Sequence, residues 1–454
     1  MTRRVLVSFN GAGSGVEELS WGQQSVWQTT VAYGSSRTVA GIDALPPGTT
    51  VADAAETLRF AVSRHQSLRT RLRFDGGPVP KQVCSASGQI WLEVVDAGDA
   101  DPAEVARAVQ LRYQTTDFDY ETEWPVRMAV ICRGRAATHA VAVYLHLAID
   151  ANGLRALMAD LTHLAPGWER TAPPVTAIEP MDQARRQRTP ATMRQGAASL
   201  RHLQRVLRAA PAGRFGPPRH DRADAGFWLL KMRSPATALA VRAIAARNDL
   251  NTSPVLLAAF AVTLARWNGV NPVFVMLMVS NRFRPGLADT VSGITQSSPC
   301  LIDVADRTID QLAVRASNLA MSAYKYAYYN PYERDAMMAA VNEERGEEVD
   351  FSCYFNDRRP PEVDSTPHPL PTDRQIGEAV PLGDLRWEKG ASMPHQKLFL
   401  GIDQIDHAVV FNLSADDRFF TAADVEAIAR GMESVAVEAA LDPSAPTGIR
   451  SAAV

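Results

Sequence analysis

One short segment of the sequence combines two residues that could carry out acid–base chemistry. His146 is followed by Asp150 after three intervening residues. A short apolar run with strand-forming residues, 140–145, precedes the pair, and leucines at helical spacing follow from Leu154. The sequence therefore predicts a turn between a strand and a helix. Such a turn can hold an imidazole as a general base while the carboxylate fixes the local backbone.

The pair alone does not establish this chemistry, because a histidine beside apolar residues is more often part of a core, and the spacing also arises by chance. The sequence contains no GxSxG, HExxH or CxxC pattern, which argues against the common hydrolases and zinc enzymes. The glycine-rich stretch 10–15 lacks the Lys-Ser/Thr of a phosphate-binding loop, so we predict a flexible turn there. We predict no metal site.

The composition argues against a protein that binds nucleic acid or spans a membrane. A chain of 454 residues with 46% hydrophobic content can form two sizeable domains. Its formal net charge of -3 provides no basic field for nucleic acid, and its longest apolar run, 255–265, is too short to span a bilayer. The four cysteines show neither the spacing of a zinc site nor that of a disulfide scaffold. We therefore expect a reduced, cytoplasmic protein.

The order of predicted elements indicates two lobes. Helices are expected from near Ser20 and over 52–65, and strands over 68–74, before the His146 turn. A stretch rich in Pro, Arg and Ala, with a helix over 191–209, forms a connection. We place the N-terminal lobe at residues 1–180, the interlobe connection at 181–225 and the C-terminal lobe at 226–454.

The second half repeats the order strand, helix, helix, strand. Predicted there are strands over 226–230 and 273–279, helices over 234–246 and 255–267, and paired strands over 398–402 and 409–413. Thr421 and Asp424 form a capping box for a last helix. The proline-rich segment 356–390 is predicted to be mostly loop.

Several motifs also occur in a fixed order along the chain. They are LSWGQQSVW at 19–27, RHQSLRT at 64–70, SNR at 280–282, VSGITQSSP at 291–299, NPYE at 330–333 and YFN at 354–356. In this order they resemble the LSxAQxRLW, RHExLRT, SGR, VGxFVNTLP, xPFE and MFN segments of the condensation-domain superfamily of nonribosomal peptide synthetases. Relatives of that superfamily include chloramphenicol acetyltransferase and polyketide-associated acyltransferases. The resemblance covers roughly residues 19–443.

Within this resemblance the opening segment is similar to the family motif HHxxxDG. The catalytic second histidine falls on His146 and the aspartate on Asp150, whereas the first histidine is Leu145 and the glycine is Ala151. Single-histidine versions occur among the polyketide-associated acyltransferases, so Leu145 is compatible with activity. Ala151 is the more serious departure, because a Cβ there could alter the turn and the access to the reacting centre. We expect Gly153 to restore some backbone freedom.

The resemblance also implies roles for other residues. Asp150 is expected to be structural and to pair with Arg282 of the opposite lobe, although capping of the following helix is an alternative and both could hold. A substrate tunnel is expected to be lined by Ser20, Gln23, Asn152, Gln296, Ser297 and Ser298. For Gln296, Ser297 and Ser298 an ordinary polar strand edge is the alternative.

The fold that the resemblance implies is α+β, with mixed α/β two-layer sandwiches. Two chloramphenicol-acetyltransferase-like lobes would form a V-shaped pseudo-dimer with a central tunnel. The implied activity is that of a free-standing acyltransferase of natural-product biosynthesis. It would transfer an acyl or aminoacyl group from a phosphopantetheine thioester to an amine.

The chain ends after one condensation-like unit, so the donor is expected on a separate carrier protein acting in trans. We expect no bound cofactor. We also expect the enzyme to be a monomer. One alternative is ester formation, with an alcohol acceptor or a coenzyme A donor. The other is a non-catalytic module that binds carrier-loaded peptide and recruits a tailoring enzyme.

Overall fold

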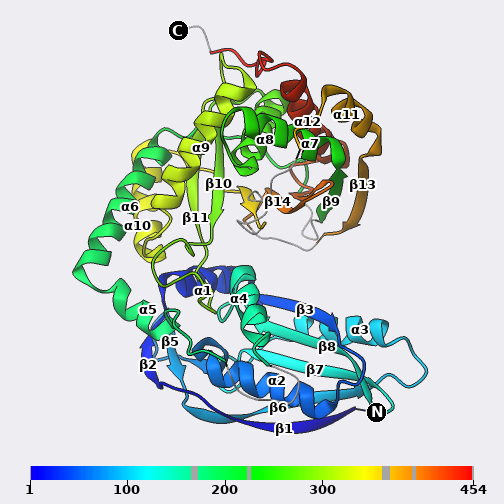
Figure 1. The fold of residues 1–454 in the computed structure, drawn as a ribbon. Coiled ribbons are helices and arrows are strands. Elements are labelled where there is room, and N and C mark those ends of the chain that lie inside the picture. The colour runs from blue at the N-terminus through cyan, green and yellow to red at the C-terminus, as the bar shows by residue number, and fades with distance from the viewer. Residues whose placement is uncertain (1, 165–171, 222–225, 360–368, 391–394, 452–454) are drawn as a thin grey trace. The chain divides into compact units, whose positions relative to one another are not determined.

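The computed structural model describes residues 2–164, 172–221, 226–359, 369–390 and 395–451. The chain divides into two compact units (Figure 1). The N-terminal unit comprises Met1–Gln195 and Ser280–Gln296, and the C-terminal unit comprises Gly196–Val279 and Ser297–Val454. This division differs from the predicted boundaries, because residues 280–296 were assigned to the C-terminal lobe and group instead with the N-terminal unit.

The N-terminal unit is built on a five-stranded sheet in which only β6 and β7 are parallel. The strand order is β1 (Thr2–Asn10), β6 (Ser87–Asp96), β7 (Val126–Arg133), β8 (Ala136–Leu145) and β3 (Thr38–Ala44). A smaller sheet has the order β2 (Gly15–Glu18), β5 (Lys81–Cys84) and β4 (Thr70–Arg73). The helices are α1 (Trp21–Tyr33), α2 (Val51–Arg64), α3 (Pro102–Thr115), α4 (Ala151–Leu161), α5 (Pro180–Gln187) and the 3-10 helix Gln66–Arg69.

Helices cover both faces of the five-stranded sheet (Figure 1). Because successive strand residues point to opposite faces, Met128 and Val130 of β7 belong to the core beneath α2 and α4. Ala129 and Ile131 belong to a second core beneath α3. The strand β8, which leads into the His146 turn, is therefore held from both sides.

The glycine-rich loop 10–15 joins β1 to β2 and surrounds a buried arginine. The guanidinium of Arg69 donates hydrogen bonds to the carbonyls of Ala12, Gly13 and Ser85, the last two at 2.8 and 2.7 Å. Only 1% of Arg69 is exposed. The loop thus offers its carbonyl oxygens to a cation, whereas a phosphate cradle would offer N–H groups.

The C-terminal unit is built on a seven-stranded mixed sheet. Its order is β11 (Gln296–Ile302), β10 (Val273–Val279), β12 (Cys353–Asp357), β14 (Leu398–Ile405), β15 (Val409–Asp416), β9 (Phe227–Ser234) and β13 (Asp384–Lys389). The helices are α6 (Pro190–Arg208), which spans the division, and α7 (Pro235–Arg247), α8 (Thr252–Asn268), α9 (Ile309–Lys325), α10 (Pro331–Arg345), α11 (Asp373–Ala379), the 3-10 helix Val380–Leu382 and α12 (Ala422–Leu441).

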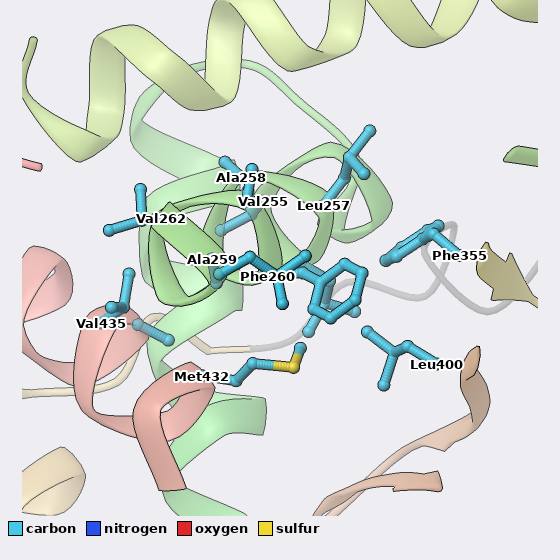
Figure 2. Close-up of a cluster of buried hydrophobic side chains, with 14 of the residues drawn as sticks. Val255, Leu257, Ala258, Ala259, Phe260, Val262, Phe355, Leu400, Met432 and Val435 are labelled. Atoms are coloured by element: carbon cyan, nitrogen blue, oxygen red, sulfur yellow. The ribbon is translucent and has the colours of Figure 1, made fainter. Parts of the chain in front are cut away.

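The helix α8 lies at the centre of this unit's core. It is apolar on all sides, and Figure 2 shows Phe260 pointing toward Phe355, Leu400 and Met432 from three other elements. The buried helix predicted from the 255–265 run is thus confirmed. No helix among the described parts of the chain combines the length and apolar character that a membrane crossing requires.

Most predicted elements of the second half are confirmed, and one is wrong. The strands predicted over 398–402 and 409–413 pair as β14 and β15, and Thr421 forms the predicted capping box of α12. The predicted loop 356–390 instead contains α11 and β13, and β13 pairs antiparallel with β9. Both elements are short and sit among prolines, which hides their periodicity. Residues 360–368 of that loop lie outside the described residues.

Candidate active site

His146 lies in the predicted turn between a strand and a helix. β8 ends at Leu145 and α4 begins at Ala151. The backbone N–H of His146 donates to the carbonyl of Arg37 at 2.8 Å, which ties the turn to the segment that leads into β3. The side chain is half-buried, and its Nδ1 is buried without a hydrogen-bond partner in the described part of the chain.

Leu145, at the position of the motif's first histidine, is a core residue. It is buried in an apolar cluster with Phe118 and Val143. Its N–H donates to the carbonyl of Pro125 at 2.9 Å. A leucine side chain at this position adds to the packing that supports the turn, so the departure from the motif has a structural explanation.

The carboxylate of Asp150 is the most heavily hydrogen-bonded group near the turn. Its Oδ1 accepts from the N–H of Gly153 at 2.8 Å and lies 2.8 Å from Nη2 of Arg282. Its Oδ2 accepts from Nη1 of Arg282 at 3.0 Å, from the N–H of Ile294 at 3.1 Å and from the hydroxyl of Thr295 at 2.8 Å. Asp150 thus caps α4 and pairs with Arg282, so both of the alternatives for this residue hold.

The electrostatics of this pair follow from its burial. Burial by itself would raise the pKa of Asp150, but the guanidinium of Arg282 and the backbone N–H donors outweigh it, and the pKa lies below its ordinary value. Because residues 280–296 belong to the N-terminal unit, the pair ties the turn to another segment of that unit. The expectation that Arg282 belongs to the opposite lobe is therefore wrong.

Gly153 and Ala151 have different roles from those expected. A Cβ on Gly153 would lie 3.1 Å from Nη2 of Arg282 and 3.2 Å from the backbone nitrogen of Ser292. Gly153 has no left-handed φ, so its small size, which allows this close approach, is what the site uses. Ala151 is exposed at the first helical position of α4, where an ordinary helical conformation accommodates a Cβ.

Two further glycines bring α1 and the loop 280–296 against the turn, and the sequence analysis missed both. A Cβ on Gly22 would lie 2.4 Å from the carbonyl oxygen of Gly293 and 2.6 Å from Cα of Ile294. A Cβ on Gly293 would lie 2.9 Å from the carbonyl oxygen of His146. A glycine inside a predicted helix was the available signal for Gly22, because such a glycine often marks close packing.

The Gly22→Ala substitution is expected to destabilise the protein. In a free helix this change would stabilise by about 1 kcal/mol. Here the Cβ would meet backbone atoms of Gly293 and Ile294 that cannot rotate away, so overpacking costs about 3 kcal/mol, the upper end of the usual range, and the net effect is a loss. A fall in the melting temperature in differential scanning calorimetry would confirm it. Gly377→Ala in α11 is the matched control, because its Cβ would meet no atom within 4 Å and should be neutral or stabilising. An unchanged or raised melting temperature for Gly22→Ala would contradict the packing argument.

Two of the predicted tunnel residues are occupied in capping α1. The N–H of Ser20 donates to Oε1 of Gln23 at 2.9 Å, and the N–H of Gln23 donates to the hydroxyl of Ser20 at 3.4 Å. At most 1% of either residue is exposed. Their contact with a substrate stays a prediction, and their burial leaves them little surface for it.

The remaining predicted tunnel residues lie on α4 and β11. Asn152 is half-buried in the first turn of α4. Gln296 is buried and donates to the hydroxyl of Ser25 at 3.4 Å within the N-terminal unit. Ser297 and Ser298 belong to the C-terminal unit, where β11 is an edge strand of the sheet and Ser298 is buried. Their role as a tunnel lining stays a prediction.

The titratable residues that the structure describes do not converge as metal ligands would. No group of three His, Cys, Asp or Glu side chains among them could hold a metal ion. All four cysteines are buried and unpaired.

Comparison with known proteins supplies a family and a fold. A family model described as Condensation domain matches residues 45–352. The structure is similar to a solved structure described as "Molecular basis for condensation domain-mediated chain release from the enacyloxin polyketide synthase". That match has a TM-score of 0.70 at 21% identity and covers 98% of this chain and 85% of the other.

Two other solved structures show the same fold. The SgcC5 protein from Streptomyces globisporus, in complex with (R)-(-)-1-(2-naphthyl)-1,2-ethanediol and sucrose, gives a TM-score of 0.71 at 19% identity and covers 94% of this chain and 100% of the other. The condensation domain from the Monacolin K polyketide synthase MokA gives 0.72 at 14% identity and covers 96% of this chain and 99% of the other. A search of curated proteins gives no significant match.

Proposed function

The chain belongs to the condensation-domain family, and from this premise we propose that it is an acyltransferase that forms an amide bond in natural-product biosynthesis. The donor would be an acyl or aminoacyl thioester on the phosphopantetheine arm of a separate carrier protein, and the acceptor a small-molecule amine. Buried, unpaired cysteines are stable in a reducing compartment, so we assign the reaction to the cytoplasm.

The observation that carries this proposal is the position of His146. Its imidazole lies on a turn held by β8, α4 and the Asp150 carboxylate, and its Nδ1 is buried. A base with its hydrogen on Nδ1 has its lone pair on Nε2, the nitrogen that a substrate can reach. This arrangement suits a general base that acts on a bound nucleophile.

The proposed reaction needs one proton transfer. The amine nitrogen attacks the thioester carbonyl carbon, a C–N bond forms, and Nε2 of His146 takes a proton from that nitrogen. As the tetrahedral intermediate collapses, the C–S bond breaks and the proton passes to the departing thiolate, which leaves as the pantetheine thiol. Because the thioester is already activated, the protein contributes mainly alignment and this proton transfer.

The start of α4 offers a means to stabilise the intermediate's oxyanion. The N–H of Gly153 donates to the carboxylate of Asp150. The N–H groups of Ala151 and Asn152 lie in the first turn of α4, where a helix has no carbonyl to accept from them. Together with the helix dipole they favour negative charge at this end of α4. We assign these two N–H groups to the carbonyl oxygen of the thioester.

A second candidate is ester formation. The structurally similar SgcC5 protein was crystallised with a 1,2-diol, and an alcohol acceptor depends on a base such as His146 even more than an amine does. Coenzyme A could replace the carrier as the donor in this reaction.

The test supplies both donors and both acceptors to the purified chain. Octanoyl and alanyl groups are presented on a phosphopantetheinylated carrier protein and on coenzyme A, with benzylamine or benzyl alcohol, and the products are weighed by mass spectrometry. Amide from the carrier-bound donor is the expected product. Ester alone, or a coenzyme A donor alone, would support the second candidate. Binding of loaded carrier without either product would overturn both and indicate a non-catalytic module.

A further inference from the structure

A pocket on the N-terminal unit is lined by residues that do not include those of the His146 turn. It has a volume of about 520 Å³, and its lining comes from β1, β4, β6 and β7, the end of α3 and the loop before β7. On this side of the sheet α3 packs on β7, β8 and β3 (Figure 1), and it reaches β6 at Glu93 and Val95. Trp91 of β6, which lines the pocket, is 52% exposed. Pockets of this size hold small organic ligands.

A rigid aromatic platform forms one wall of the pocket. The guanidinium carbon of Arg71 lies 3.5 Å from the centre of the Trp124 ring. Trp124 is buried, donates from Nε1 to the carbonyl of Gln89 at 2.8 Å, and makes an edge contact with Phe9. A guanidinium stacked on a fixed indole keeps its N–H edges free for a carboxylate or phosphate.

The charges in the pocket are unbalanced once existing partners are counted. Two of its acidic side chains have basic partners, Glu93 with Arg112 and Glu123 with Arg127, whereas Asp119 accepts a hydrogen bond from the hydroxyl of Thr122 and keeps its charge. In contrast, neither Arg4 nor Arg71 makes an ion pair or side-chain hydrogen bond to any residue in the described ranges, and Nε of Arg71 is buried without a partner. Arg4 and Arg71 thus face one carboxylate without a basic partner, Asp119, and one net positive charge remains for a ligand.

The environment of Arg71 supports this conclusion. Burial lowers the pKa of Arg71, and the nearby carboxylate of Asp119 only partly opposes that effect. A cation that has lost water without gaining an ion-pair partner interacts strongly with an incoming anion.

We propose that this pocket binds a small organic anion, whose carboxylate or phosphate is held by Arg71 and Arg4 and whose apolar part lies against Trp91. This inference does not rest on the acyl-transfer proposal, because it is argued from the side chains of this pocket and its test requires no turnover.

The test measures binding to the full chain by isothermal titration calorimetry. Benzoate and phenyl phosphate are the probes, with benzyl alcohol and benzylamine as uncharged and cationic analogues. At least one anion should bind saturably and about 10-fold or more tighter than benzyl alcohol. A preference for phenyl phosphate would point to a phosphorylated ligand and a preference for benzoate to a free acid. Equal binding of benzyl alcohol or benzylamine, or no saturable binding of either anion, would overturn the proposal.

Two variants and a matched control locate the site. Arg4→Gln changes an exposed residue and should weaken anion binding about 10-fold without unfolding the chain, and Arg71→Gln should do the same if it folds. Arg3→Gln is the control, because Arg3 is also exposed on β1 and carries the same charge but does not line the pocket. Arg3→Gln should change affinity by less than about two-fold. An equal loss of anion affinity in Arg3→Gln and Arg4→Gln would mean that the anion responds to the overall positive charge and not to this pocket, which would overturn the proposal.

Discussion

Replacing His146 with alanine is expected to lower the turnover number by about 100-fold or more. The substitution removes Nε2, the proposed acceptor of the nucleophile's proton, while the turn keeps its backbone hydrogen bond to Arg37 and its Asp150 anchor. The side chain is half-buried and makes no side-chain hydrogen bond through Nδ1 to the described residues, so the fold should tolerate its loss. The measurement is steady-state kinetics on the product identified by mass spectrometry.

The acceptor distinguishes a base from a positioning group. A neutral amine already has an available lone pair, whereas an alcohol must lose its proton as it attacks, so loss of a true base should slow the alcohol reaction more. An unchanged circular dichroism spectrum would exclude misfolding as the cause. Near-wild-type turnover of His146→Ala with either acceptor would remove His146 from the proton transfer and leave it a positioning role.

The local structure around His146 could be predicted because local patterns determine it. The apolar run 140–145 predicted the strand that ends at Leu145, and the leucines at helical spacing from Leu154 predicted the helix that starts at Ala151. Both are confirmed. The capping box at Thr421 was predicted in the same way and is confirmed. The order of the motifs along the chain predicted the condensation-domain family, and the family model that matches residues 45–352 confirms it.

Contacts between distant segments could not be predicted in this way. The loop 280–296 begins 130 residues after Asp150, and its Arg282, Ile294 and Thr295 all donate to that carboxylate within the N-terminal unit. No local sequence pattern predicts which lobe a loop packs against. The close approach of Gly22 to Gly293 has the same character, because it depends on the path of two backbones.

Separating the Asp150–Arg282 pair is expected to destabilise the N-terminal unit by about 3 to 5 kcal/mol. In Arg282→Met the carboxylate stays buried without its counter-charge, and in Asp150→Asn the guanidinium does. The double variant Asp150→Asn/Arg282→Met leaves neither charge and should cost less than the sum of the two single variants. Denaturant unfolding measures this coupling, and faster amide hydrogen exchange at Gly153, Ile294 and Thr295 would localise it. Additive losses would contradict a direct pairing.

The pH dependence of the single variant gives a second, sharper test. In the wild-type protein the pKa of Asp150 is lowered, so its stabilising contribution is present above the pKa of the unfolded chain and is lost as the pH falls through the folded-state pKa. In Arg282→Met, burial without a counter-charge should raise this pKa above its unfolded value, so the contribution is present at low pH and is lost as the pH rises. The stability difference between wild type and Arg282→Met should therefore grow from about pH 5 to about pH 8. In the double variant, which has no carboxylate at position 150, that growth should disappear. A constant difference across this range would mean that the 280–296 loop is held by its packing and not by the charge of Asp150.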